Sequence, residues 1–186
     1  MTNQDTQLPR YQVFLQEKID TPHRDVGSVH AADPEMALQN ARDVFVRRPE
    51  CVSLWVVPAN KTYAKTEQEL QAITQSTGQG KDIDTIASTT YCVFIKQKSV
   101  GTRTYAGELR ASSPDEAIHR AREKFLKDSK PFAWLVFPKH LLVDSKENDL
   151  ESMFTPAREK SFRMATDFHT LTEMRKILAQ KKQEED

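Results

Sequence analysis

Two stretches of the sequence decide the fold. They are YQVFLQEKIDTPHRDVGSVHAADPEMALQNARDVFVRRPECVSLWVVP at residues 11–58 and YCVFIKQKSVGTRTYAGELRASSPDEAIHRAREKFLKDSKPFAWLVFP at residues 91–138. They align without a gap when the chain is shifted by 80 positions, and thirteen of the 48 aligned positions are identical. Most of the identical residues, such as Gly27 and Gly107, are ones that packing or backbone geometry would require. The chain is therefore a tandem duplication of one small unit.

Each repeat predicts the order strand, strand, helix, strand. In the first repeat, apolar and polar residues alternate over 11–16, and the polar loop 20–23 leads into a second strand over 26–31. The short apolar runs 52–57 and 132–137 predict the closing strands, and each of them is followed by a proline that cannot donate a ladder hydrogen bond.

The helix of each repeat has a clear start. Asp33 before Pro34 predicts an N-cap, and Ser113 with Glu116 three residues later predicts a capping box in the second repeat. One apolar face at helical spacing should then cover a sheet. The predicted face consists of Ala37, Leu38, Ala41, Val44 and Phe45 in the first repeat and of Ala117, Ile118, Ala121 and Phe125 in the second.

We therefore predict an α+β fold in which the two strand-strand-helix-strand repeats form a pseudo-two-fold pair with a partly helical C-terminal tail. A unit of about 48 residues buries only a marginal core, so we expect each repeat to pack against the other. The formal charges of the repeats, −2 and +4, favour their pairing or mark different outer surfaces. The predicted organisation is an N-terminal tail at 1–10, repeats at 11–58 and 91–138, a linker at 59–90 and a docking tail at 139–186.

The linker and the tail carry helix signals of their own. Thr66 with Glu69 predicts a capped helical segment in the linker, and Thr155-Pro156 and Thr170 with Glu173 predict helix starts in the tail. An apolar stripe in the tail should dock either on this chain or on a partner protein. The stripe consists of Leu171, Met174, Ile177 and Leu178.

Composition excludes several classes of protein. Lys and Arg number 27, as do Asp and Glu, so no overall charge favours nucleic acid or an anionic membrane. No apolar run approaches a membrane span, and the N-terminal sequence lacks the pattern of a signal peptide, so we expect a cytoplasmic protein. Cys51 and Cys92 are too few for a disulfide framework and are expected to be reduced apolar fillers.

Catalytic signals are weak. The sequence lacks the nucleophile elbow, the P-loop, the dinucleotide fingerprint and the C-x-x-C motif. Glu116 and His119 form one Glu-x-x-His of the type found in di-iron bundles, but a bundle needs two, and the first repeat has Met36 and Gln39 at these places. We predict no catalytic, cofactor-binding or metal-binding residue.

The first repeat and the tail carry a longer pattern. It consists of HRxVGSVHAAD at 23–33, ALQNARD at 37–43, Arg47-Arg48, SLWVV at 53–57, MFTPAxxKSFR at 153–163 and Phe168-His-Thr170, where x is a position that the pattern leaves open. Through these residues the chain resembles the B subunit of the ring-1,2-phenylacetyl-CoA epoxidase complex, also called phenylacetate-CoA oxygenase. The family pattern has a single unit and a glycine at the place of Cys51. The second repeat replaces His23, Ser28, His30 and Asn40 by Arg103, Glu108, Arg110 and Arg120.

The resemblance implies an accessory role in aromatic catabolism. It predicts a non-catalytic subunit without cofactors that organises a di-iron monooxygenase acting on an aromatic acyl-CoA. The implied partners are the di-iron catalytic subunit and a structural helical subunit, and the reductase is a further candidate. Binding to nucleic acid or to a membrane is not expected. Polar residues of the first repeat that the second does not retain are the candidate partner-binding surface. They are His23, Arg24, His30, Asn40, Arg47 and Arg48.

Two other functions remain open from the sequence. The chain could be an acyl-CoA or small-molecule sensing module, in which basic residues of the second repeat bind the CoA phosphates. Saturable binding of phenylacetyl-CoA by the isolated chain would favour this alternative. An independent enzyme would have His23 and His30 as its centre. The basic residues that would bind the CoA phosphates in the first alternative are Arg103, Arg110, Arg120 and Lys124.

Overall fold

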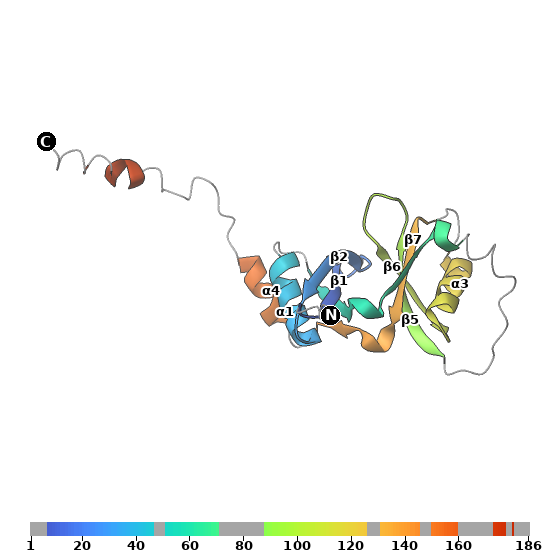
Figure 1. The fold of residues 1–186 in the computed structure, drawn as a ribbon. Coiled ribbons are helices and arrows are strands. Elements are labelled where there is room, and N and C mark those ends of the chain that lie inside the picture. Colours follow the sequence, from blue (N-terminus) through green and yellow to red (C-terminus); the bar gives the residue numbers. More distant parts are fainter. Residues whose placement is uncertain are drawn as a thin grey trace, which may run out of the picture.

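The structure is a computed structural model that describes residues 7–46, 51–70, 88–125, 131–145, 150–159, 173–177 and 180. It is an α+β fold, in which an antiparallel sheet of eight strands lies between helices at its two ends (Figure 1). Within the described residues, no helix is long and apolar enough to cross a membrane.

The two repeats contain the predicted order of elements. In the first repeat they are β1 (Arg10–Gln16), β2 (Arg24–His30), α1 (Pro34–Phe45) and β3 (Ser53–Pro58). In the second they are β5 (Thr89–Lys96), β6 (Thr104–Ala111), α3 (Pro114–Phe125) and β7 (Ala133–Pro138). A short 3₁₀ turn follows each closing strand, at Ala59–Lys61 and at Lys139–Leu141.

Both helices begin as predicted. The Asp33 carboxylate accepts a hydrogen bond from the Met36 amide at 2.8 Å, and Ser113 Oγ accepts one from the Glu116 amide at 3.2 Å. The Glu116 carboxylate reaches back to the Ser112 amide at 2.7 Å. The bonds to Asp33 and Ser113 satisfy amides that a helix N-terminus leaves without intrahelical partners, whereas Glu116 bonds to the residue before the Ser113 cap.

The predicted helix faces are confirmed except at Val44, which is 47% exposed. Phe45, the next residue, turns its ring toward Gly27 instead, and a Cβ atom at Gly27 would lie 3.2 Å from that ring. Val44 points about 100° away from Phe45 around the helix axis, and in this last turn that direction leads to solvent. The backbone φ of Gly27 is 132°, which disfavours other residues there.

The second repeat uses the same arrangement. The pairing of β1 with β2 shifts register after the pair Val13 and Gly27, and that of β5 with β6 shifts after the pair Val93 and Gly107. Phe125 covers Gly107 as Phe45 covers Gly27. Each shift is a β-bulge, which bends and twists the hairpin over its helix.

Two further strands are exchanged between the repeats, because each follows one repeat in the sequence and pairs with the other repeat. The strand order is β4-β7-β5-β6-β2-β1-β3-β8. The linker supplies β4 (Tyr63–Thr66), which pairs with β7 of the second repeat, and the tail supplies β8 (Val143–Asp144), which pairs with β3 of the first repeat. Neither strand was predicted from the sequence. The predicted Thr66–Glu69 cap is present directly after β4, with the Thr66 amide donating to the Glu69 carboxylate at 2.7 Å.

The tail docks on this chain through α4 (Leu150–Glu159). Because this helix already includes Thr155 and Pro156, the helix start predicted there was wrong. The helix begins at Leu150, and the side chains of Met153 and Phe154 pack against the core of the first repeat, where Phe154 is 3% exposed. The predicted start at Thr170, and Leu171 and Leu178 of the stripe, lie outside the described residues. The stripe residues Met174 and Ile177 are 56% and 54% exposed.

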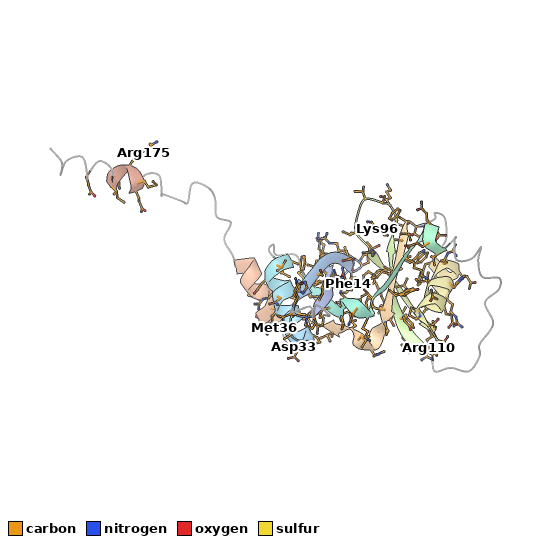
Figure 2. All side chains as sticks on the ribbon, in the orientation of Figure 1. Phe14, Asp33, Met36, Lys96, Arg110 and Arg175 are labelled. Atoms are coloured by element: carbon orange, nitrogen blue, oxygen red, sulfur yellow. The ribbon has the colours of Figure 1, made fainter. Side chains whose placement is uncertain are left out.

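Three apolar clusters hold the structure together. One lies between α1, α4 and the strands of the first repeat, and another between α3 and the strands of the second. The third joins the repeats on the strand faces turned away from the helices and includes Phe14, which lies in the middle of the folded part of the chain (Figure 2). The ring centroids of Phe14 and Phe94 are 4.1 Å apart there. Cys51 and Cys92 are buried free cysteines, as predicted.

Candidate partner-binding surface

The predicted partner-binding residues do not form one cluster. His23 directly precedes β2, Arg24 is the first residue of this strand, and His30 is its last. A strand rises about 3.3 Å per residue, so seven residues separate the two groups by roughly 20 Å. His23 and His30, which an independent enzyme would need together in one catalytic centre, are separated by the same distance.

His23 lies inside the protein, at the junction of the two repeats. It is 6% exposed, its ring stacks on Trp55 with centroids 3.6 Å apart, and its Nε2 lies 3.0 Å from Ser53 Oγ. Its carbonyl oxygen accepts a hydrogen bond from the Tyr105 amide of the second repeat at 2.8 Å. The Trp55 ring in turn contacts Tyr105 edge-on at 5.3 Å. The His23 side chain therefore stabilises the junction rather than an outer surface.

Burial lowers the pKa of His23 to about 4, from an ordinary value of 6.5. The unfolded chain then binds a proton at a higher pH than the folded chain, so stability is full above pH 6.5 and is lost as the pH falls toward 4. We expect the free energy of unfolding to fall by about 1–2 kcal/mol through His23 between pH 7 and pH 5.

Urea unfolding of wild type and His23→Gln at pH 7, 6 and 5 measures this effect. The glutamine variant should lose most of the pH slope, whereas His30→Gln, which retains His23, should keep it. Equal slopes for His23→Gln and the wild type would contradict a buried neutral imidazole.

A buried carboxylate lies at the same junction. Asp25 is 8% exposed and accepts hydrogen bonds from Arg103 Nη1 at 2.9 Å, from Gln12 Nε2 at 2.5 Å and from the Gly27 amide at 3.2 Å. The strands β2 and β6 pair there, where the Asp25 amide donates to the Arg103 carbonyl oxygen at 2.8 Å. Arg24 is turned toward the carboxylate of Glu17 on the same hairpin. The ion pair between Asp25 and Arg103 therefore joins the two repeats at this junction.

His30 and Asn40 are close together at the other end of β2. The Asn40 amide donates to the His30 carbonyl oxygen at 3.0 Å and thereby ties α1 to the strand. In the second repeat, Arg120 donates to the Arg110 carbonyl oxygen at the same distance. Asn40 and Arg120 therefore make the same fold contact with different chemistry. The exposed His30 ring contacts the Leu8 carbonyl oxygen at 2.7 Å.

The basic residues of the second repeat are mostly engaged. Arg103 binds Asp25, Arg120 forms an ion pair with Glu116 at 2.6 Å, and Lys124 donates to the Glu108 carbonyl oxygen at 2.9 Å. Arg110 is exposed, and its side chain has no partner among the described residues. Of the four basic residues named for the acyl-CoA alternative, three are thus engaged by other groups, so the geometry of these four does not favour that alternative.

The Glu-x-x-His pair has structural contacts. Glu116 binds Ser112 and Arg120, whose hydrogen bonds lower the pKa of its carboxyl group, with the Ser112 contacts the largest cause. His119 is exposed on α3. Across the part of the chain that the structure describes, no three His, Cys, Asp or Glu residues gather as a metal site would require.

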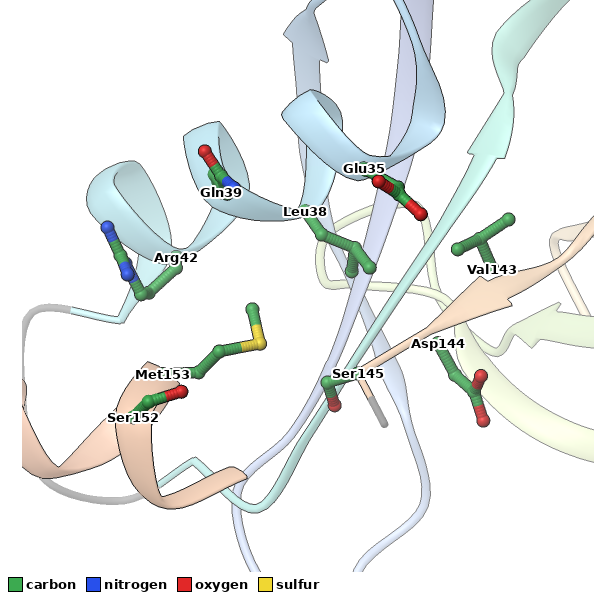
Figure 3. A pocket seen from close by; sticks show the side chains of 9 residues that line it. All are labelled: Glu35, Leu38, Gln39, Arg42, Val143, Asp144, Ser145, Ser152 and Met153. Carbon is green, nitrogen blue, oxygen red and sulfur yellow. The ribbon is translucent and has the colours of Figure 1, made fainter. Parts of the chain in front are cut away.

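A cavity of about 390 Å³ lies between α1, β8 and α4 (Figure 3). Leu38, Val143 and Met153 supply its apolar lining. The polar lining consists of Glu35, Gln39, Arg42, Asp144, Ser145 and Ser152. Sequence reasoning missed this cavity because it forms only when the tail strand β8 and helix α4 dock on the first repeat. No local motif marks these residues as neighbours.

Comparison with protein families shows what the chain is related to. The family model described as phenylacetic acid degradation B matches residues 7–82 and 88–175, which together cover most of the chain. The chain belongs to the phenylacetic acid degradation B family. Both repeats, and the tail as far as residue 175, fall within the matched ranges, so the resemblance seen in the first repeat extends to the second.

One curated member of this family shows the relation in detail. The B subunit of the 1,2-phenylacetyl-CoA epoxidase of Escherichia coli (strain K12) is 51% identical to the chain over 61 residues. These residues are 33% of the present chain, and the alignment spans 64% of the length of that relative. No solved structure matches the chain.

Proposed function

We propose that the chain is a non-catalytic accessory subunit of a multicomponent di-iron monooxygenase that acts on phenylacetyl-CoA or a similar aromatic acyl-CoA. In this role it binds and organises the catalytic and helical hydroxylase subunits. The observation that carries the proposal is the family match over both halves of the chain, together with the E. coli relative that is named as a subunit of the epoxidase.

Two features of the geometry support the non-catalytic part of the proposal. Glu116 caps a helix and pairs with Arg120, and His23 is stacked on Trp55 at the junction of the repeats. Two of the side chains that could have served as a metal ligand or an acid-base group are thus engaged in local structure.

We further propose that the repeats form a pseudo-two-fold pair. Exchanging each element of the first repeat with its counterpart in the second turns the strand order into its own reverse. Phe14 and Phe94 occupy equivalent positions and contact each other, as expected for residues beside a two-fold axis. Such a chain would replace a homodimer of single units and present two related but unequal outer surfaces to its partners.

The proposed partner surface can be tested at Arg47 and Arg48, whose structure lies outside the described residues. Changing both to alanine should leave the chain folded but weaken its binding to the hydroxylase subunits by about thirtyfold or more, because interface arginines often contribute about 2 kcal/mol. Binding is measured by isothermal titration with the purified subunits, and folding by circular dichroism.

The second repeat provides the matched control. Changing Lys124 and Lys127 to alanine removes two cations from the equivalent region and should alter binding by less than about threefold. Equal binding of the two double variants, or unfolding of the arginine variant, would remove Arg47 and Arg48 from the proposed interface. A wild-type chain that binds no hydroxylase subunit would refute the accessory role itself.

A further inference from the structure

The two edge strands of the sheet are held in different ways. In the second repeat, β4 forms four cross-strand pairs with β7. Its Lys65 also donates to the Asp115 carboxylate of α3 at 2.8 Å, and Glu67, directly after the strand, forms an ion pair with Arg122 of α3 at 2.6 Å. The edge strand β4 is therefore tied to the helix of the second repeat as well as to the sheet.

The edge strand of the first repeat has fewer attachments. β8 forms two cross-strand pairs with β3. Ser145, the next residue, makes two hydrogen bonds with Leu54, whose amide donates to Ser145 Oγ at 3.1 Å and whose carbonyl oxygen accepts from the Ser145 amide at 2.9 Å. Among the side chains that the structure describes, no ion pair joins β8 or α4 to the first repeat. The acidic residues Asp144 and Glu151 of these two elements are exposed instead.

The packing of α4 on the first repeat depends mainly on one side chain. Of the α4 side chains that the structure describes, Phe154 alone is buried, at 3% exposure. The cavity of about 390 Å³ lies beside this contact, and Leu38, Val143 and Met153 line it (Figure 3). Side chains that line a cavity lack packing contacts on that side. The tail is therefore attached to the first repeat by few bonds and by an incompletely packed contact.

We propose that β8, Ser145 and α4 form a releasable strap, which opens as one unit while the rest of the sheet stays folded. The chain before the strap has an anchor of its own, because Leu141 and Leu142 pack against the third apolar cluster, which joins the repeats. Strand β3 keeps its six pairs with β1 when the strap opens. Segments with few buried contacts open at a lower free energy than the core does.

The strap controls access to this end of the sheet. When it opens, the outer edge of β3 and the apolar site that Phe154 fills become available to another chain, since an unpaired strand edge can pair with a new strand. When it closes, both are covered by the tail. The inference goes beyond the proposed function and does not depend on it, because the strap opens without a partner.

Amide hydrogen exchange measured by NMR tests the proposal at single residues. Successive residues of a strand direct their amides to opposite neighbours. Because the Leu54 amide bonds to Ser145, the Val56 amide also faces the strap, whereas the amides of Trp55 and Val57 face β1. Opening of the strap should therefore allow exchange at Leu54 and Val56 and leave Trp55 and Val57 protected.

The second repeat provides the matched control. Trp134 and Val136 of β7 are equivalent to Leu54 and Val56 and pair with β4 instead of the strap. In the wild-type chain, the protection factors of Leu54 and Val56 should be lower than those of Trp134 and Val136 by about tenfold or more. Equal protection of the two pairs would overturn the proposal. An equal loss of protection at the β3 amides that face β1 would also overturn it, because the whole strand would then open.

A variant of α4 tests whether the strap opens as one unit. Phe154→Ala removes the buried anchor and should lower the protection of Leu54 and Val56 by a further factor of about ten or more, while Trp134 keeps its wild-type value. Leu70→Ala is the matched control, because Leu70 is 5% exposed and packs against the core of the second repeat. It should leave Leu54 and Val56 unchanged. Unchanged protection of these two amides in Phe154→Ala would show that β8 is held independently of α4 and would overturn the strap.

Discussion

Replacing Arg122 by alanine should lower the free energy of unfolding by about 3–5 kcal/mol, because it leaves a buried carboxylate without its cation. That carboxylate belongs to Glu67, which is 7% exposed and comes from the linker, directly after β4. It accepts hydrogen bonds from Arg122 Nη2 at 2.6 Å and from the indole N–H of Trp134 at 3.2 Å. Urea unfolding followed by circular dichroism measures the loss.

The first repeat contains the control for this prediction. Arg42 is equivalent to Arg122, but its partner is the exposed, adjacent Asp43, so Arg42→Ala should cost less than about 1 kcal/mol. The double variant Glu67→Gln/Arg122→Met removes both charges and should be more stable than Arg122→Ala alone. Similar losses for Arg42→Ala and Arg122→Ala would show that the Glu67 contact contributes little.

Phe14→Ala should cost about 3–5 kcal/mol, as expected for truncating a fully buried aromatic side chain. Phe14 is 0% exposed, and its ring lies 4.1 Å from that of Phe94 and 5.4 Å from that of Phe137, measured between centroids. Both contacts cross from the first repeat to the second. The loss should therefore appear as a melting temperature lower by roughly 10 °C, measured by calorimetry.

Phe132→Ala is the matched control, since Phe132, directly before β7, is 40% exposed. It should lower stability by less than about 1 kcal/mol. If Phe14→Ala were no more destabilising than Phe132→Ala, the aromatic cluster between the repeats would not be a main source of stability.

Elements within one repeat could be predicted because their signals are local. Asp33-Pro34 and Ser113-Pro114 mark helix starts whatever the rest of the chain does, and alternation over 11–16 is typical of a strand. The exception within β1 is Phe14, which lies on the face away from α1 and is nevertheless fully buried. Its burial depends on the other repeat, which alternation within one strand cannot show.

The edge strands could not be predicted for a similar reason. Tyr63–Thr66 is short and half-polar, and Val143–Asp144 is two residues long, so neither carries enough periodicity to predict a strand. Each is a strand because an unpaired edge of the other repeat is available to it. The Thr66 cap was predictable, since it needs only residues three apart.

The candidate site was predicted only in part. Comparing the repeats identified Asn40 as a residue that the second repeat does not retain, yet Arg120 reaches the equivalent carbonyl oxygen. A contact can thus be retained when the residue type is not. The cavity between α1, β8 and α4 escaped notice because residues of its lining such as Leu38 and Val143 are 105 positions apart and come together only through the exchange of the edge strands.

That exchange also sets the order in which the protein can finish folding on the ribosome. Strand β3 at residues 53–58 has β8 as its outer neighbour, and Trp55 pairs with Asp144, 89 residues further along the chain. At a synthesis rate of about 5–20 residues per second, β8 is made roughly 5–20 s after β3. During that interval the nascent first repeat exposes an unpaired strand edge, a hazard for aggregation that ends only when the last quarter of the chain emerges.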